Sequence, residues 1–351
     1  MELKHGGDWK SFLDSTNEMP LDFSASISPL GLPDGVRDAA TASLDRADLY
    51  PDPLCRDLVS ELARHHNVNS ECIIAGCGAS DIIERLLKAA DPDRVLVTAP
   101  AFSGYTDALY GMGCTVSKYP LSEDNGFRIK EDILGYITDD TDILFLCEPN
   151  NPTGGCTEMH IMESILERCR ETGTILALDE CFNDFLDDGE ERSLTGRLDA
   201  CRLVVIRAFT KFYAMPGLRL GYAMSGDTDL IEKMRQASQP WSVSVVAEAA
   251  GRAALKETEY AARLKKLIKS ERTRMKKELS SLGFRSVQGD ANFIFFYSDV
   301  RDLDERLRKK SVLIRDCSNF DGLEKGWFRA AVRTVEENDK LLRALRGALN
   351  D

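Results

Sequence analysis

The sequence predicts an α/β protein with a large domain, in which helices enclose a mostly parallel sheet, and a smaller α+β domain. Four short apolar runs suit buried strands and lie at residues 94–98, 143–147, 174–178 and 203–207. Helical patterns fall between them, at about 103–111 and 158–170. Strands that alternate with helices in this way form parallel sheets covered on both faces. In such sheets a ligand binds beyond the carboxyl ends of the strands.

The pattern changes after residue 243 to long charged helices and then to short strands. Helices are expected at about 245–255 and 259–282, and strands at 292–297, 312–315 and 327–333. This change predicts a separate small domain. We therefore expect an N-terminal arm at 1–35 that joins the small domain, a large ligand-binding domain at 36–240 and a small C-terminal domain at 241–351.

Composition and charge exclude several classes of function. The chain has 351 residues, 43% of them hydrophobic, which is enough for a sizeable core. Its formal net charge of -13 disfavours nucleic acid and anionic membrane surfaces as partners. No apolar run approaches the ~20 residues of a membrane span. The ten cysteines form no C-x-x-C pair and residues 1–10 are polar, so we expect no metal site and a cytoplasmic protein with reduced thiols.

A lysine comes shortly after the fourth of these apolar runs, at 203–207. Lys211 lies among aromatic and apolar residues such as Phe209, Phe212 and Met215, and Arg219 comes a few residues later. Desolvation lowers the pKa of an amine, and a neutral amine attacks carbonyl groups. The stretch is therefore typical of a Schiff-base lysine with Arg219 as partner for an anion. The alternative is an ordinary loop lysine beside a buried strand.

A glycine-rich segment precedes a predicted helix. Gly76 and Gly78 lead through Ala79 and Ser80 into a helical stripe of apolar residues. Backbone amides at such a helix start form a cradle for an anion. The segment lacks both G-x-G-x-x-G and G-K-[ST], which disfavours the nucleotide-binding motifs. A simple tight turn is the alternative.

Four polar residues follow the ends of the predicted strands, namely Tyr105, Asn151, Asp179 and Lys211. A buried Asp179 requires a cation, since an unpaired buried charge is costly. A pyridinium nitrogen supplies the cation, an aldehyde suits Lys211, and a phosphate suits the glycine cradle with Arg219. Pyridoxal phosphate meets all three needs. A helix cap or a structural ion pair is the alternative for Asp179.

Two arginines interrupt the apolar strand patterns near the C-terminus. Arg315 and Arg329 lie where surface arginines would alternate with other polar residues. A guanidinium group binds carboxylate and phosphate through two parallel hydrogen bonds. Both residues are candidate substrate anchors, and structural ion pairs are the alternative.

These motifs together resemble a known family. The turn at Asn151-Pro152-Thr153-Gly154, the strand end at Asp179-Glu180-Cys181-Phe182, the pair Thr210-Lys211 and the segment 217–221 are similar to fold-type I pyridoxal-phosphate enzymes of the histidinol-phosphate aminotransferase group. The segments 5–7, 22–25, 211–219, 239–243 and 314–317 resemble the threonine-phosphate decarboxylase branch, which serves cobalamin biosynthesis.

The resemblance implies a role for each matching position. Lys211 would bind the cofactor, Asp179 its ring nitrogen and Asn151 its phenolic oxygen, and Tyr105 would stack on the ring. The cofactor phosphate would be held by Gly78, Ala79, Ser80, Thr210, Arg219 and, from a neighbouring subunit, Tyr50. The substrate would be bound by Arg329 at its carboxylate and by His5, Ser26 and Arg315 elsewhere. A shared site of this kind implies a homodimer.

The resemblance also bears on the reaction. Phe182 stands where aminotransferases of the group usually have tyrosine, which favours decarboxylation of a phosphorylated amino acid. The expected substrate is L-threonine O-3-phosphate, with L-serine O-phosphate or a phosphonate amino acid as options. An aminotransferase acting on histidinol phosphate or an aromatic amino acid is the rival, and a non-catalytic binding protein is a third reading. The chain departs from the decarboxylase pattern at Ser26, Ser28, Cys77, Ala208 and Ser244.

Overall fold

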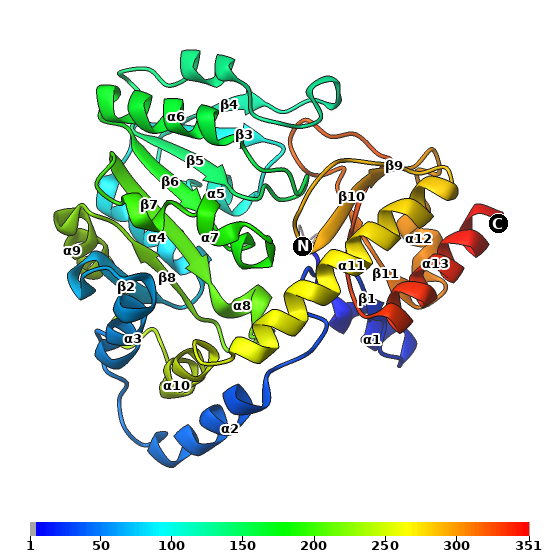
Figure 1. Ribbon diagram of the computed structural model, residues 1–351, viewed down its shortest axis with the longest axis horizontal. Coiled ribbons are helices and arrows are strands. Elements are labelled where there is room, and N and C mark those ends of the chain that lie inside the picture. The colour runs from blue at the N-terminus through cyan, green and yellow to red at the C-terminus, as the bar shows by residue number, and fades with distance from the viewer. Residues whose placement is uncertain (1–4, 351) are drawn as a thin grey trace.

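The computed structural model describes residues 5–350, which are arranged around a large and a small sheet (Figure 1). The large sheet has seven strands in the order β2-β8-β7-β6-β5-β3-β4. They are β2 (Ile73–Gly76), β3 (Arg94–Ala99), β4 (Thr115–Pro120), β5 (Ile143–Cys147), β6 (Ile175–Asp179), β7 (Arg202–Ala208) and β8 (Gly221–Met224). All neighbouring pairs are parallel except those that β8 makes with β2 and β7. The predicted mostly parallel sheet is confirmed.

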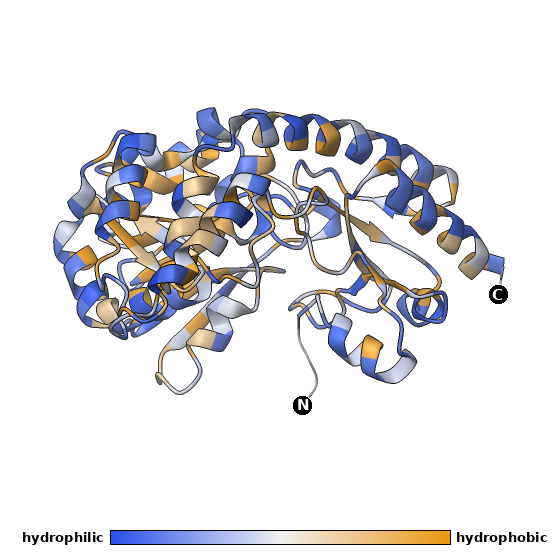
Figure 2. Cartoon of the chain, turned by 90° about the horizontal axis from the view of Figure 1, so that it is seen from below, coloured by the Kyte–Doolittle hydropathy of each residue, from blue (hydrophilic) through white to orange (hydrophobic). Residues whose placement is uncertain are grey.

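Helices cover both faces of this sheet. Leu144 and Leu176 pack with α3 (Arg56–His66), α6 (Met159–Thr172) and α10 (Val245–Ala254). Their neighbours Phe145 and Ala177 pack on the opposite face with α4 (Ala79–Ala90), α5 (Gly104–Ala108) and α9 (Thr228–Gln236). Because successive side chains alternate between two buried faces, the central strands are apolar over most of their length. Figure 2 shows these strands as hydrophobic segments inside helices whose outer faces are hydrophilic.

The small sheet is antiparallel and has the order β12-β13-β10-β9. Its strands are β9 (Arg285–Ser286), β10 (Phe293–Tyr297), β12 (Arg315–Asp316) and β13 (Trp327–Ala331). Strands β10 and β13 pack with the long α11 (Thr258–Ser281), α12 (Leu303–Arg308) and α13 (Val335–Asn350) in one apolar cluster. Phe182 and Phe212 belong to the same cluster, so the end of the large sheet is joined to the small one through aromatic packing.

The N-terminal segment reaches the small sheet region. After α1 (Trp9–Thr16), β1 (Leu21–Asp22) pairs in parallel with β11 (Val312–Leu313), and α2 (Asp34–Ala42) follows. The prediction of a single strand at 312–315 is wrong, because this run divides between two sheets. Strand β11 pairs with β1, whereas β12 pairs with β13. The domain boundaries at 35 and 240 stay predictions. No helix within residues 5–350 combines the length and apolar character needed to cross a membrane.

The reversed direction of β8 determines where the site forms. Because β8 runs antiparallel to β2 and β7, its first residue lies beside their last residues, as the pairs Gly76–Gly221 and Ala208–Gly221 show. Gly78 follows β2, Lys211 follows β7 and Arg219 precedes β8. The topology therefore brings the glycine cradle, the lysine and the arginine to one edge of the sheet.

Candidate active site

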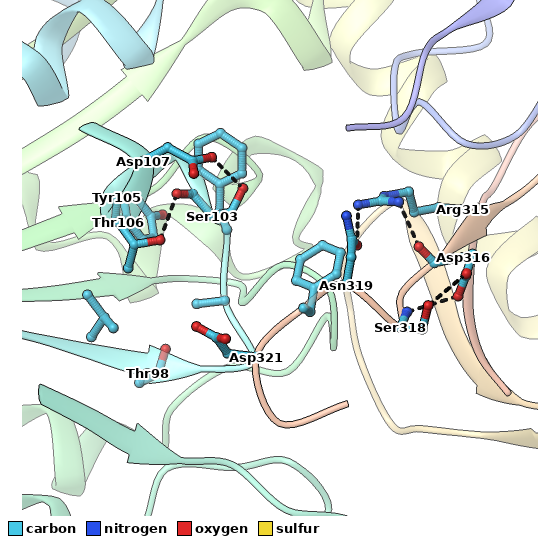
Figure 3. Close-up of a pocket in the computed structure, with 14 residues that line it drawn as sticks. Thr98, Ser103, Tyr105, Thr106, Asp107, Arg315, Asp316, Ser318, Asn319 and Asp321 are labelled. Carbon is cyan, nitrogen blue, oxygen red and sulfur yellow. Dashed lines mark hydrogen bonds between the residues drawn. The ribbon is translucent and has the colours of Figure 1, made fainter. Parts of the chain in front are cut away.

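A cavity of about 330 Å³ lies at this edge, between the large and small sheets. Most of the predicted site residues line it, namely His5, Ser26, Ala79, Ser80, Asn151, Asp179, Thr210, Lys211, Arg219, Arg315 and Arg329. A second cavity of about 340 Å³ adjoins it (Figure 3), and the two share Phe102, Ser103, Arg315 and Phe320 in their walls. Within the described part of the chain, His, Cys, Asp and Glu side chains form no cluster suited to a metal ion.

Lys211 lies on the short helix α8 (Phe209–Phe212), three residues beyond β7. Its flanking residues Phe209 and Phe212 are buried. Burial, and after it the positive charge of Arg329, lower the pKa of the Lys211 amine to about 8, against the opposing effect of Cys181. A substantial fraction of this amine is therefore neutral, and nucleophilic, near neutral pH.

Asp179 ends β6 and its side chain is buried. Its Oδ1 accepts a hydrogen bond from the backbone N–H of Cys181 at 2.9 Å, and its Oδ2 accepts one from the hydroxyl of Tyr105 at 2.7 Å. Among residues 5–350, no cationic side chain forms an ion pair with it. The structural ion pair considered for Asp179 is thus not formed, and the buried carboxylate suits a cation supplied by a ligand.

Tyr105 does not lie where the stacking role requires it. It is absent from the wall of the cavity that Lys211 lines, and its ring stacks on Phe145, with centroids 5.0 Å apart and planes 12° apart. The aromatic residue in that wall is Phe102, three positions earlier. The prediction is wrong because α5 turns Tyr105 toward the sheet, whereas Phe102 precedes the helix. Phe102 was not predicted, although it follows the same strand.

The glycine cradle and Arg219 form one anion site. Gly78 has φ of +87° and precedes α4, and a Cβ atom placed on it would lie 2.7 Å from Nη2 of Arg219. The guanidinium therefore lies directly beside the helix N-terminus, which itself favours anions. No carboxylate in the described residues pairs with Arg219, whose Nη1 donates to the carbonyl of Pro216 at 3.3 Å. This arrangement fits a phosphate group.

Arg329 forms a second site for an anion. It lies in β13, is 6% exposed, and donates through Nη1 to Oδ1 of Asn151 and through Nη2 to the carbonyl of Ser24 at 2.9 Å. Its Nε has no hydrogen-bond partner, and no carboxylate in the described chain pairs with it. Burial lowers the pKa of Arg329 to about 10. A carboxylate bound here would meet a desolvated cation. The backbone contribution of Ser24 was not predicted.

Arg315 stands where the two cavities meet. Its Nη1 donates to the carbonyl of Asp316 and its Nη2 to Oδ1 of Asn319, both at 2.7 Å (Figure 3). Its guanidinium carbon lies 5.2 Å from the ring centre of Phe320. The guanidinium is thus held by its own loop, in the wall of both cavities.

The five positions that depart from the decarboxylase pattern differ in their surroundings. Ser28 contacts the hydroxyl of Tyr260 at 2.5 Å and Ser244 caps α10, so both have structural contacts outside the cavity. Ser26 and Ala208 lie in the cavity wall, and the buried hydroxyl of Ser26 has no partner. The backbone N–H of Cys77 donates to Asp81 at 2.6 Å.

Tyr50 lies outside the cavity of its own chain. It is 80% exposed and its ring contacts that of Trp241, with centroids 4.7 Å apart. Its contribution to the site of a neighbouring subunit stays a prediction.

Comparison with known proteins agrees with this geometry. The family model described as aminotransferase class I and II matches residues 18–345. The chain belongs to the aminotransferase class I and II family.

Relatives of this family member include both enzyme types considered above. The threonine-phosphate decarboxylase of Salmonella typhimurium is 36% identical over 98% of this chain and 96% of its own. Histidinol-phosphate aminotransferase 1 of Archaeoglobus fulgidus is 33% identical over 86% of this chain and 91% of its own. The crystal structure of the histidinol-phosphate aminotransferase from Clostridium acetobutylicum has a TM-score of 0.88 at 30% identity and covers 93% of this chain and 98% of that one. The predicted fold-type I architecture is confirmed.

The family membership and the cavity residues identify the cofactor of this aminotransferase class I and II member as pyridoxal phosphate. The fit rests on three features. Gly78 leaves room beside Arg219 for a phosphate. Asp179 offers a buried carboxylate without a cationic partner. Lys211 offers an amine of lowered pKa.

Proposed function

We propose that the chain is a pyridoxal-phosphate-dependent decarboxylase of a small phosphorylated amino acid. The main substrate in this proposal is L-threonine O-3-phosphate, which would give (R)-1-aminopropan-2-yl phosphate for cobalamin biosynthesis. L-Serine O-phosphate, which would give ethanolamine phosphate, is the second candidate. The similarity to the Salmonella typhimurium threonine-phosphate decarboxylase supports this choice.

One observation supports this function over transamination. Phe182 lines the cavity with Asp179 and Lys211, packs edge-on against Phe293, and offers no hydroxyl group. The side chain at this position therefore gives the cofactor an apolar contact and no hydrogen-bond donor. An aromatic residue without a hydroxyl changes the electronic environment of the ring, which is one of the means by which a protein selects among reactions of the same cofactor.

The residues of the cavity then have distinct roles. Pyridoxal phosphate, when bound, supplies an electron-accepting ring for bonds at Cα of an amino acid. Arg329 binds the carboxylate of the substrate, and the arm residues His5 and Ser26 with Arg315 bind its phosphate end. Lys211 Nζ donates the proton that replaces the departing CO2 at Cα, and solvent restores that proton. A strong interaction with Arg329 also stabilises the bound substrate, which by itself does not accelerate the reaction. The rate therefore depends on how this interaction changes as the carboxylate loses its charge and CO2 forms.

Transamination is the second candidate, because the Archaeoglobus fulgidus and Clostridium acetobutylicum relatives are histidinol-phosphate aminotransferases. In that reaction Lys211 Nζ would remove the Cα proton, and the carboxylate would stay on the substrate.

The two reactions differ in their products. Purified protein with pyridoxal phosphate is incubated with threonine phosphate, serine phosphate or histidinol phosphate, each with and without 2-oxoglutarate. We expect CO2 and an amine phosphate from threonine phosphate without any keto acid, identified by mass. Turnover that requires 2-oxoglutarate and leaves the carboxylate in place would overturn the decarboxylase proposal. No product under any condition would favour a non-catalytic binding protein.

We further propose a homodimer with shared sites. Tyr50 and Trp241 form an exposed aromatic pair that lies outside the cavity of its own chain. Mixed dimers of Tyr50→Ala and Lys211→Ala chains test this arrangement. If Tyr50 acts across the interface, one of the two sites in the mixed dimer combines both defects and the other is intact, so activity reappears on mixing.

A further inference from the structure

Tyr105 and Asp179 form a buried hydrogen-bonded pair that links two segments of the large sheet region. The hydroxyl of Tyr105 donates to Oδ2 of Asp179 at 2.7 Å, and the exposed fractions of the two residues are 1% and 5%. The tyrosine comes from α5, after β3, and the aspartate from the end of β6. In the sheet, β5 lies between those two strands, so the bond spans a neighbouring strand.

The ring of Tyr105 is fixed on two sides. It stacks on Phe145 of β5 at 5.0 Å, and Phe102 packs edge-on against it at 5.5 Å and 87°. A ring held in this way directs its hydroxyl along one line. Phe102 in turn lines the cavity, whereas Tyr105 is absent from the wall that contains Lys211. The segment thus supplies one aromatic residue to the wall and another to the aspartate behind it.

Each oxygen of the Asp179 carboxylate accepts a hydrogen bond from the protein. The backbone N–H of Cys181 donates to Oδ1 at 2.9 Å, and Tyr105 donates to Oδ2. A carboxylate has about four lone-pair positions, so two donors fix its plane and leave others for a ligand. Hydrogen bonds to a charged acceptor are stronger than those between neutral groups. The orientation of this carboxylate is therefore determined by Tyr105 and Cys181 together.

We propose that Tyr105 is a positioning residue that acts through Asp179, holding its carboxylate in the orientation that meets the ring nitrogen of the cofactor. This inference rests on the pyridoxal-phosphate-dependent function proposed above. It replaces the stacking role predicted for Tyr105 and leaves the ring face of the cofactor to Phe102. Burial, together with the negative charge of Asp179, raises the pKa of Tyr105 well above its ordinary value, so the hydroxyl stays protonated and remains a donor.

The test uses Tyr105→Phe, which keeps the ring and its stacking on Phe145 and removes only the hydroxyl. The dissociation constant of pyridoxal phosphate is measured from its absorbance, together with that of 1-deazapyridoxal phosphate, in which a C–H group replaces the ring nitrogen. We expect Tyr105→Phe to weaken pyridoxal phosphate about tenfold, the size of one hydrogen bond to a charged group. The dissociation constant of the deaza analogue, which offers Asp179 no ring nitrogen, should change by less than about twofold.

Tyr119→Phe is the matched control. Tyr119 is also 1% exposed, and its hydroxyl donates to a carboxylate oxygen of Asp132 at 2.5 Å, but it lies outside the cavity wall. Its removal should leave both dissociation constants unchanged. An equal loss for both cofactors, or no loss with pyridoxal phosphate, would overturn the positioning role and leave the proposed function standing. Failure of the unaltered protein to bind pyridoxal phosphate would instead overturn the proposed function.

A second variant tests whether Tyr105 acts through Asp179 or independently of it. Asp179→Asn retains a carbonyl oxygen that can accept from Tyr105 but removes the negative charge. If Tyr105 acts through the carboxylate, adding Tyr105→Phe to Asp179→Asn weakens cofactor binding no further. A full additional tenfold loss in the double variant would mean that Tyr105 acts independently of Asp179, contrary to the proposal.

Discussion

The backbone N–H of Ser28 donates a hydrogen bond to the carbonyl oxygen of Lys211 at 2.9 Å. The N-terminal arm is thereby attached to the segment that carries the lysine, although the two are far apart in the sequence. Ser24 and Ser26, a few residues earlier in the arm, line the cavity. The position of the arm and the position of the lysine are therefore mechanically linked, and a change in one is expected to affect the other.

Replacing Lys211 with alanine should abolish turnover and the cofactor adduct that borohydride traps. The amine of Lys211 is the cavity's only lysine nitrogen among the residues that the structure describes. Lys276→Ala is the control, because the amine of Lys276 also has a pKa lowered by burial but donates to the carbonyl of Gly289 at 2.7 Å, away from the cavity. Mass spectrometry of the reduced protein checks the adduct. Full adduct yield in Lys211→Ala would contradict the assignment.

The pH dependence of adduct formation should follow the lowered pKa of Lys211. With a pKa of about 8, roughly one-tenth of the amine is neutral at pH 7. The neutral fraction rises as pH rises and saturates above the pKa, so the rate of adduct formation should increase up to about pH 8 and then level off. The charge of Arg329 contributes to this lowering, so Arg329→Gln should move the midpoint upward. Stopped-flow absorbance measures both, and a rate that climbs steadily to pH 10 would contradict the expectation.

Arg329→Lys should weaken the interaction with the substrate but leave binding of the product unchanged. Lysine keeps a positive charge but cannot form two parallel hydrogen bonds with a carboxylate. We expect kcat/KM for threonine phosphate to fall about 100-fold. The affinity for the amine product, which has no carboxylate, should hardly change. Arg333→Lys, four residues after Arg329 and paired with Glu337 at 2.8 Å, is the control. An equal loss of substrate and product affinity would argue against a carboxylate site.

Gly78→Ala should weaken binding of the cofactor phosphate. A Cβ atom at this position would lie 2.7 Å from Nη2 of Arg219, and the residue has φ of +87°. Gly113 has a similar φ of +77° but open space around it, so Gly113→Ala carries the backbone strain without the contact. We expect the dissociation constant of pyridoxal phosphate to rise in Gly78→Ala alone. Pyridoxal, which lacks the phosphate, should bind both variants alike, and a matching loss with pyridoxal would assign the effect to strain.

The ion pair next to Asp179 should contribute stability. Glu180 contacts Nη2 of Arg207 at 2.6 Å, with side-chain exposures of 1% and 9%. Breaking a buried pair leaves an uncompensated charge, so Glu180→Gln should lower the free energy of unfolding by about 3 kcal/mol. Glu278→Gln, at the exposed pair with Arg346, should change it by less than about 1 kcal/mol. Chemical denaturation of both variants provides the comparison, and equal effects would mean that burial does not determine the contribution.

The sequence predicted the parts of the fold whose side chains are buried on both faces. The runs that form β3, β5, β6 and β7 are apolar over most of their length, so the sequence predicts them as strands. The edge strand β4 is largely exposed and polar, and β8 has only four residues, so neither gave a periodic signal. Asn151, Asp179 and Lys211 can be proposed as site residues for the same reason, because each follows or ends one of these strands, and all three line the cavity.

Other features depended on local geometry that spacing does not encode. Phe102 and Tyr105 follow the same strand, and only the start of α5 decides which of them faces the cavity. Ser28 and Ser26 have similar sequence surroundings, but Ser28 contacts Tyr260 while the hydroxyl of Ser26 has no partner. The orientation of individual side chains thus decides which residues have structural contacts and which lie in the cavity wall.

The pairing of β1 with β11 has a consequence for synthesis of the chain. Leu21 pairs with Val312, so the ribosome makes the two strands 291 residues apart, the difference between the two numbers. The large sheet is complete once residue 224 has emerged, but the arm remains unpaired until the last part of the chain follows. Since domains generally fold as they leave the ribosome, the nascent protein holds a folded sheet and an unfinished site while the 105 residues from Met224 to Arg329, the difference between the two numbers, are translated. Arg329, from that last part, reaches the site at the end.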